Sequence, residues 1–386
     1  MVATDIQQPP AKTRSASSRV ASLDGIRALA ILAVILYHLG FAGWSGGFIG
    51  VNVFFVLSGY LITSLLLKEQ MQTGSIHLGR FWFRRVLRLY PTLIGVVIVG
   101  ASLWFLVRSD GASLRLDAGG AALIALTYTG NIARAFGHLS QGVFAPTWSL
   151  AMEEQFYLLW PPALLLLLSK GLRRRTIAWA LAVLVVAFSV TSGLLFVPPN
   201  PGATPDIYFN PISSAAPLLL GAVLALTLTH ERARSFFAGV WGRVAIWLGF
   251  VGIVGLMVQI TIEDNWQQEA HVFGLTLPAV ALATAFLVAG LVSRPSVLGS
   301  VLSWKPLSWF GRNVSYSLYL WHMLVIALLE PFVSGFLGQL VLVAASIAVA
   351  IGSHYAIERP FLKVKARFEP ASWSAPAKRE RELAKA

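Results

Sequence analysis

The chain of 386 residues contains no cysteine. Disulfide bridges, thiolate nucleophiles and cysteine-ligated metals are therefore excluded. Charged residues are scarce too, at 12% of the chain, whereas soluble domains carry about 25%. Hydrophobic residues make up 56% and the mean hydropathy is +0.70. A chain this apolar must bury most of its surface in lipid, so we expect an all-α membrane protein.

Signals typical of several other protein classes are also missing from the sequence. It contains no Gly-rich phosphate loop, His-x-x-x-His zinc pattern or Ser-nucleophile elbow. We therefore expect neither a metal nor a bound cofactor. The first apolar run is long and has no small-residue cleavage site, which argues against a secretory signal.

Apolar runs of about 20 residues predict a bundle of about ten transmembrane helices. A shorter apolar run at 118–133 is predicted to lie on the outer side without spanning. The expected spans are 23–41, 48–67, 89–107, 147–168, 176–197, 212–229, 241–261, 271–292, 314–333 and 337–357.

Lysine and arginine orient this bundle, because short cytoplasmic loops carry an excess of both. With both termini inside, 26 of the 30 lysines and arginines fall on inside segments. If 118–133 also spanned, "KGLRRR" (170–175) would face outward. We therefore expect a multi-pass protein of the cell membrane with cytoplasmic termini. The net charge of +13 then reflects orientation, and no nucleic-acid partner is expected.

The chain divides into three parts by composition. Residues 1–20 are polar and rich in proline and serine, which predicts a disordered cytoplasmic lead. Residues 21–361 form the predicted ten-helix transmembrane domain. Residues 362–386 form a basic tail that is expected in the cytoplasm.

Arg27 and His38 are ionisable residues inside the first apolar run. Their spacing corresponds to three helical turns plus about 20°, so both side chains project from one face, about 16 Å apart along the axis. Arg27 could instead extend to the inner headgroups, and His38 could bond a neighbouring helix. Intramembrane ionisable groups are by default functional, so both are candidate site residues.

Two glutamates open the span "WSLAMEEQFYLLWPP" (148–162). Glu153 is expected about 9 Å below the outer surface, and His38 about 22 Å up a hydrocarbon core of about 30 Å. Both estimates give the same level, where a carboxylate would orient the imidazole and support it as a base. Glu154 diverges from Glu153 by about 100° on the helix and is expected near the interface.

The segment "GFIGVNVFFVLSGYLIT" (47–63) supplies two further polar candidates. Asn52 is expected at a depth comparable with His38, as a buried hydrogen-bond partner or a substrate contact. Ser58 lies near mid-membrane and, with Gly50 and Gly59, suits close helix packing.

The segment "GRFWFRRVLRLYP" (79–91) is predicted to form a cytoplasmic amphipathic helix. Such a helix rests on the membrane with its aromatic side chains inserted. Its basic face would bind either anionic lipid or a polyphosphate ligand. That face holds Arg80, Arg84 and Arg88 with Arg85 beside them, roughly opposite Trp82, Val86 and Leu89.

Two late segments hold the remaining candidates. In "SYSLYLWH" (315–322), Tyr316 and His322 are candidate site residues, with His322 about 12 Å above the cytoplasmic end of its span. In "HYAIERPF" (354–361), Glu358 and Arg359 are predicted to pair at the end of the last span.

Taken together, these residues resemble the acyltransferase-3 family of membrane O-acyltransferases. The matching segments follow the family's order from about residue 20 to 361. They are Arg27-x10-His38, "GVNVFFVLSGYLIT", "FRRVLRLYP", "WSLAMEEQFYLLWP" and "SYSLYLWH". One position departs from the family pattern, which often has Asp where this chain has Asn52.

The resemblance implies transfer of an acyl group, commonly acetyl, from acyl-CoA to a hydroxyl of a sugar-bearing acceptor. Acceptors in the family are cell-surface glycans, glycolipids and macrolides. With a short basic tail after the last predicted span, we expect a stand-alone member without a fused periplasmic hydrolase-like domain. The implied catalytic residues are Arg27, His38 and Glu153, and the implied acyl-CoA-binding residues are Arg80, Arg84, Arg85 and Arg88. His38 would act as a general base or form an acyl-histidine.

A transporter or flippase of a polar or glycosylated substrate is the competing interpretation. It too would line its path with buried arginine, histidine and glutamate. Against it, the sequence shows no pair of discontinuous helices in two matching halves. A transporter moves substrate without releasing CoA, whereas an acyltransferase releases free thiol in the presence of acceptor.

Overall fold

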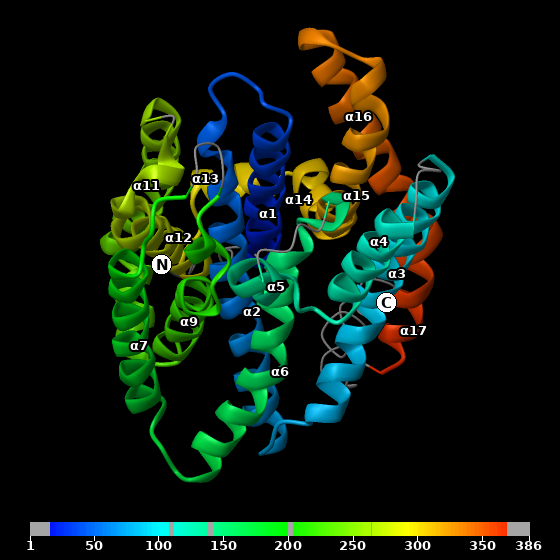
Figure 1. Cartoon of the computed structure of the whole chain (residues 1–386). Helices are drawn as coiled ribbons and strands as arrows, with labels where there is room; N and C mark the ends of the chain where they lie inside the picture. The colour runs from blue at the N-terminus through cyan, green and yellow to red at the C-terminus, as the bar shows by residue number, and fades with distance from the viewer. Residues whose placement is uncertain (1–15, 108–111, 138–141, 200–203, 264, 369–386) are drawn as a thin grey trace, which may run out of the picture.

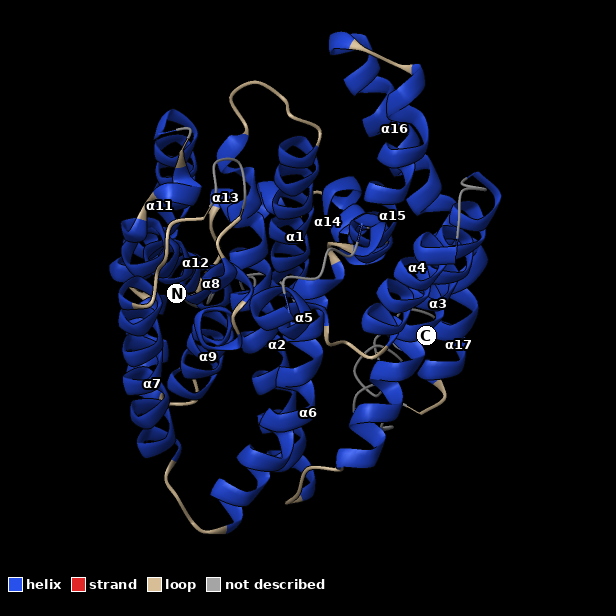
Figure 2. Cartoon of the chain, in the orientation of Figure 1, coloured by secondary structure: helices blue, strands red, loops and turns tan. Residues whose placement is uncertain are grey.

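The protein is a bundle of helices in a computed structural model that describes residues 16–107, 112–137, 142–199, 204–263 and 265–368. The described residues contain no strand (Figures 1 and 2). The long helices are α1 (Ala16–His38), α2 (Gly50–Thr73), α3 (Leu78–Val107), α6 (Thr147–Ser169), α7 (Arg174–Leu194), α11 (Val240–Glu263), α12 (Leu277–Ser293) and α16 (Gly335–Ser353).

Shorter helices connect and cap the long ones. They are α4 (Ala112–Leu126), α5 (Gly130–Gly137), α8 (Asp206–Phe209), α9 (Pro211–Thr227), α10 (Glu231–Ala238), α13 (Val297–Leu302), α14 (Lys305–Asn313), α15 (Ser315–Leu329) and α17 (Arg359–Ala366). Short 3₁₀ turns occur at η1 (Ser45–Ile49), η2 (Gly142–Phe144), η3 (Trp266–Gln268) and η5 (Glu330–Phe332), and π-helical turns at η4 (Val272–Thr276) and η6 (His354–Glu358).

The helices are those of a membrane protein, but the structure does not confirm ten spans. Among the described residues, seven helices are long and apolar enough to cross a membrane. Two bent pairs, α9 with α10 (98°) and α14 with α15 (67°), bring the number to at most nine. The predicted span 147–168 does form α6, but it is not among these helices, because Glu153, Glu154 and Gln155 lower its hydropathy. The segment 118–133 forms parts of α4 and α5, separated by a turn.

Figure 1 shows the α2–α3 and α6–α7 connections at the lower end of the bundle, opposite the loop that follows α1. The α6–α7 connection carries Lys170 and Arg173, and the helices that flank the other connection carry Lys68 and Arg80, all predicted to lie inside. The arrangement therefore agrees with one end of the bundle being the basic end.

α1 and α2 form the centre of the bundle. Their buried side chains belong to two apolar cores, one shared with α3, α6 and α15 and the other with α11 and α12. The close packing expected of the glycines is confirmed. A Cβ at Gly50 would clash with the carbonyl of Ala30, and one at Gly59 with the carbonyl of Leu218.

The predicted separate amphipathic helix at 79–91 is not what the structure shows. These residues begin the continuous helix α3, which runs through Pro91. Trp82 does not face lipid, because its Nε1 donates to the carbonyl of Tyr157 on α6 at 3.0 Å. Pro161 has no N–H to bond that carbonyl, so the indole supplies the missing donor.

The two ends of the chain also differ from the expected boundaries. α1 begins at Ala16, inside the predicted lead of residues 1–20. α17 covers the first residues of the predicted tail, because Pro360 stands at the start of a new helix, where its missing N–H costs nothing. Residues 1–15 and 369–386 lie outside the described residues.

Candidate functional site

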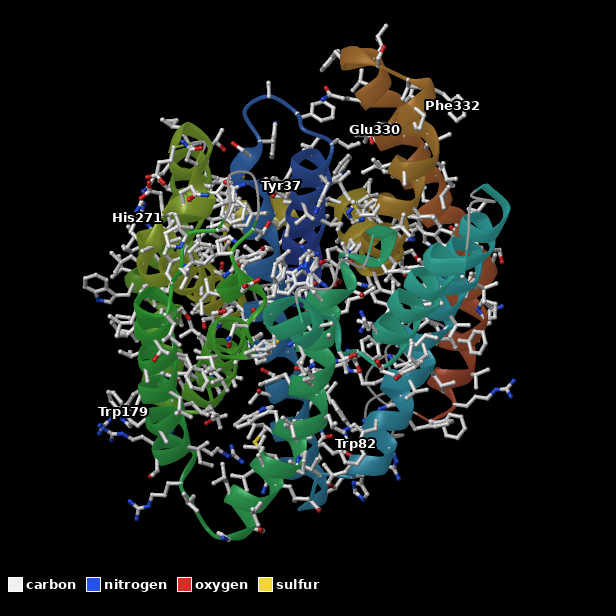
Figure 3. All side chains as sticks on the ribbon, viewed as in Figure 1. Tyr37, Trp82, Trp179, His271, Glu330 and Phe332 are labelled. Carbon is white, nitrogen blue, oxygen red and sulfur yellow. The ribbon has the colours of Figure 1, made fainter. Side chains whose placement is uncertain are left out.

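Two neighbouring cavities lie between α1, α2, α6 and α15. The lower cavity, about 50 Å³, is lined by Arg27, Glu153 and Tyr316 among others. The upper cavity, about 90 Å³, is lined by His38, Arg134, Trp148, Tyr208, Trp266 and others. Val51 and Tyr319 line both cavities, so the two adjoin. Figure 3 places Tyr37, the neighbour of His38, near the upper end of α1, and Trp82 near the lower end of the bundle.

The lower cavity holds a carboxylate and a guanidinium, those of Glu153 and Arg27. Glu153 accepts a hydrogen bond from Ser58 Oγ at 2.5 Å. The guanidinium of Arg27 lies 5.9 Å from the centre of the Phe54 ring. The positive charges of Arg27, Arg85 and Arg88 all act on Glu153. The arrangement balances a buried carboxylate with several cations, as burial requires.

The predicted contact between Glu153 and His38 is wrong. Glu153 bonds Ser58, and no hydrogen bond joins it to His38 in the described part of the chain. Gly50 packs on Ala30, so α2 begins about 12 Å below His38. Ser58 is a further two turns down α2, about 24 Å below the level of His38. Helix length alone could not show this offset between neighbouring helices.

Two histidines lie side by side at the upper cavity, and one of them, His38, lines it. The ring centres of His38 and His322 are 5.0 Å apart. His38 Nδ1 lies 2.9 Å from the carbonyl oxygen of Val34, and His322 Nδ1 lies 2.8 Å from that of Tyr319. Because a carbonyl only accepts, both Nδ1 atoms carry the proton and both Nε2 atoms keep a free lone pair. Each imidazole can therefore accept a proton through Nε2.

α15 is fixed in rotation by polar contacts on both sides. On the cavity side, Tyr319 Oη and Ser149 Oγ are 2.6 Å apart. On the opposite side, Ser317 Oγ donates to Glu358 Oε1 at 2.6 Å and Trp321 Nε1 donates to Ser353 Oγ at 2.9 Å. These bonds hold the fully buried His322 toward His38.

The predicted Glu358–Arg359 pair is not formed. Glu358 instead pairs with His354 Nδ1 at 2.9 Å, and Arg359 lies over the Tyr355 ring at 5.5 Å. Adjacent helical positions diverge by about 100°, so Arg359 cannot share the buried face of Glu358.

The arginines of α3 do not form one basic face. Arg80 is exposed, whereas the buried Arg84 lies 3.9 Å from Glu69 of α2. Arg85 lies 4.3 Å from the centre of the Tyr157 ring. Arg88 is half-buried, and the like charges of Arg27 and Arg85 repel its guanidinium. Contacts with α2 and α6 thus separate residues that helical spacing alone places together.

The other predicted polar residues are spread over several environments. Tyr316 lines the lower cavity and donates to the carbonyl of Leu89 at 2.7 Å. Glu154 Oε1 is buried without a hydrogen-bond partner in the described chain, which does not fit a simple position at the interface.

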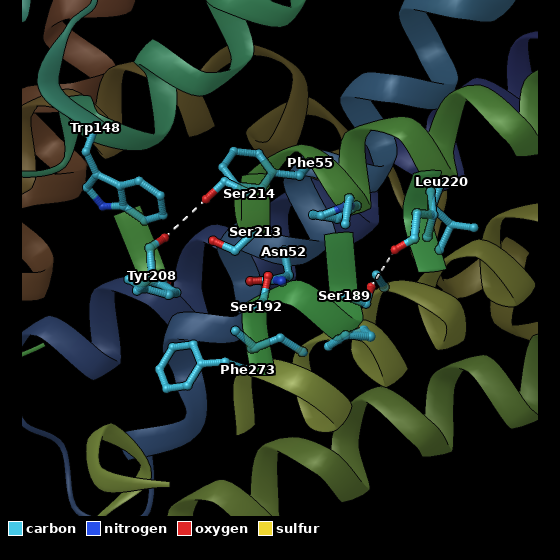
Figure 4. A pocket seen from close by; sticks show the side chains of 16 residues that line it. Asn52, Phe55, Trp148, Ser189, Ser192, Tyr208, Ser213, Ser214, Leu220 and Phe273 are labelled. Atoms are coloured by element: carbon cyan, nitrogen blue, oxygen red, sulfur yellow. Dashed lines mark hydrogen bonds between the residues drawn. The ribbon is translucent and has the colours of Figure 1, made fainter. Parts of the chain in front are cut away.

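Asn52 lies in a third cavity, away from His38. Figure 4 shows it beside Ser192 and Ser213, with Trp148 and Tyr208 toward one end. These two aromatic residues also line the upper cavity. Asn52 was predicted at a depth comparable with that of His38, but the two residues line different cavities.

Sequence reasoning missed Arg134, which lines the upper cavity from α5. Arg134 is one of the four lysines and arginines that do not fall on the predicted inside segments, and that exception to the charge bias is the signal that could have found it. Burial lowers the pKa of its guanidinium, although an arginine stays cationic at neutral pH. In the described residues, no cluster of three histidine, aspartate or glutamate side chains could hold a metal ion.

Comparison with known proteins supplies the context for this site. Residues 20–358 match a family described as an acyltransferase domain. No solved structure is significantly similar to the chain.

The similar curated proteins are O-acetyltransferases by name. The peptidoglycan O-acetyltransferase OatA of Listeria monocytogenes is 34% identical over 364 residues, covering 91% of this chain and 57% of the relative. A provisionally named O-acetyltransferase of Staphylococcus aureus strain COL is 33% identical, covering 89% of this chain and 57% of the relative. The chain thus spans just over half the length of these relatives. With the family match extending from the start of α1 to Glu358, the chain belongs to the acyltransferase-3 family.

Proposed function

We propose that the protein transfers an acyl group, most simply acetyl, from cytoplasmic acyl-CoA to a hydroxyl of a sugar-bearing acceptor. The observation that carries this proposal is the pair of adjacent imidazoles with free Nε2 atoms, of which His38 lines the upper cavity. Family membership and the names of the relatives support acyl transfer as the chemistry. The relatives make peptidoglycan a first acceptor to test, beside glycolipids and macrolides.

In this proposal His38 Nε2 takes the proton of the acceptor hydroxyl. The hydroxyl oxygen attacks the thioester carbonyl carbon, the C–S bond breaks, and the departing thiolate recovers the proton from the imidazolium. The Val34 carbonyl holds His38 in the required tautomer, a role that the sequence had assigned to Glu153. A transient acyl-histidine is the covalent alternative.

The lower cavity is proposed to receive the donor. Arg27 lines this cavity together with Glu153, and the charges of Arg85 and Arg88 also act on that carboxylate. Guanidinium groups pair well with phosphate oxygens, so these arginines would hold CoA phosphates while the thioester extends toward His38. The basic end of the bundle would then face the cytoplasm, in the cell membrane.

The test is acetyl transfer by isolated membranes supplied with labelled acetyl-CoA and peptidoglycan, glycolipid or macrolide acceptors. We expect acceptor-dependent thiol release by the wild type and none above background by His38→Ala. The matched control is His230→Ala, which removes an exposed histidine before α10. Wild-type transfer by a normally inserted His38→Ala protein would refute the assignment, and substrate flux without thiol release would favour a transporter.

A further inference from the structure

Arg134 is held over the upper cavity by a short helix that is fixed to α6. The side-chain amides of Asn131 and Gln155 bond each other in both directions, at 2.9 and 3.2 Å. Gln155 Nε2 also donates to the carbonyl of Tyr128 at 2.9 Å. These bonds fix α5, and with it the residue one turn after Asn131. The position of Arg134 is therefore built into the fold.

The guanidinium of Arg134 presents unused donors. It stacks on Phe209, with Cζ 3.9 Å from the ring centre. Stacking covers a face of the planar group, whereas its N–H donors lie along the edge. Arg84 and Arg312 each lie beside a carboxylate, of Glu69 and Asp24. Arg134 forms no such ion pair within the described chain, although the charge of Asp206 acts on it.

Aromatic rings frame the same cavity. Phe48 and Trp266 stack with ring centres 3.9 Å apart, and Trp148 lies 4.8 Å from Tyr208. Flat apolar faces with polar edges suit a sugar ring, which also presents C–H faces and hydroxyl edges. The cavity thus combines surfaces for a sugar, the free imidazole nitrogen of His38 and one guanidinium without an ion-pair partner among the described residues.

We propose that Arg134 binds an anionic group, a carboxylate or a phosphate, on the acceptor sugar whose hydroxyl reaches His38. The inference rests on the proposed function, since it assumes that the acceptor enters the upper cavity. It adds a substrate class: acidic sugars are acceptors, and neutral sugars bind more weakly. The N–H groups of a planar guanidinium match the oxygens of a carboxylate and of a phosphate equally well. The experiment therefore tests the two anions separately.

The experiment measures calorimetric binding to the purified full-length protein. One probe pair is N-acetylmuramic acid and its methyl ester, and the other is N-acetylglucosamine 6-phosphate and N-acetylglucosamine. We expect the wild type to prefer at least one anion over its neutral partner by about tenfold. Arg134→Gln should abolish that preference and Arg134→Lys should retain part of it. Arg234→Gln, which removes an exposed arginine of α10, should keep it fully.

The pair that shows the preference identifies the anion. Equal binding of charged and neutral probes by the wild type, including no binding of either, would overturn the inference. So would an anion preference that survives in Arg134→Gln. This binding readout is separate from transfer: failure of His38→Ala to abolish transfer would refute the proposed function and leave the Arg134 preference standing.

Discussion

The lower and upper cavities adjoin, yet they solve different physical problems. The lower cavity contains a carboxylate bonded to Ser58 and surrounded by the charges of three arginines. The upper cavity is lined by aromatic rings and by His38, which lies against His322, and both imidazoles are bonded to backbone carbonyls. Buried charge needs opposite charge, whereas proton transfer needs an unoccupied lone pair. In the proposed function, the lower cavity holds the phosphates of the donor and the upper cavity performs the chemistry on the acceptor.

The largest expected effect is a loss of kcat when a histidine at the upper cavity is replaced. His38→Ala should lower kcat by about 10²–10⁴-fold, the usual contribution of a general base. His322→Ala should also lower kcat, and the double variant should lose less than the product of the single losses, because the two rings share one site. Single-turnover kinetics would measure this. Fully multiplicative losses would show that the histidines act independently.

The next effect concerns binding rather than rate. Arg27→Gln should raise the KM for acyl-CoA by about tenfold and leave kcat nearly unchanged, because it removes the proposed phosphate contact and no proton acceptor. Steady-state kinetics over a range of donor concentrations would test this. A drop in kcat with an unchanged KM would contradict the proposal that the lower cavity binds the donor and the upper cavity performs the chemistry.

Stability can test the lower cavity without any substrate. Ser58→Ala removes the donor to Glu153 and should lower the free energy of unfolding by about 1–3 kcal/mol. Ser189→Ala is the matched control, since that hydroxyl bonds only the Val185 carbonyl of its own helix. Equal denaturation midpoints for the two variants in detergent would mean that the Ser58 bond contributes nothing special.

The smallest effect tests the support below the lower cavity. Trp82→Phe should cost about 1 kcal/mol, because the Tyr157 carbonyl loses its donor. Adding Pro161→Ala restores a backbone N–H to that carbonyl and should recover part of the loss. A double-mutant cycle in thermal unfolding measures the coupling. Additive losses would show that the indole bond does not compensate for the proline.

Much of the protein was predictable because its signals are local. Apolar runs identified the helices, and small residues identified close approaches such as Gly59 against Leu218. The spacing of Arg27 and His38 predicted one lining face of α1, and the two residues do line adjoining cavities. The order of five motifs was enough to indicate the family that the comparison shows.

The partners of those residues were not predictable, because they depend on the relative heights of helices. α2 begins about two turns below His38, and Glu153 bonds Ser58 of that helix instead of the predicted His38. Contacts with α2 and α6 separated the arginines that helical spacing had placed together. Arg134 entered the site only because a short helix is fixed across the cavity by an amide pair.

The sequence by itself determined that this is a helical membrane protein, which stretches are helical, and which residue types are too costly to bury without a purpose. Burial costs and helical period are properties of single residues and short segments. Only the tertiary structure decided which ionisable groups meet. Those contacts depend on how far one helix is shifted along its neighbour, and the neighbours come from segments far apart in the chain. A shift of one turn changes every partner on a helix face.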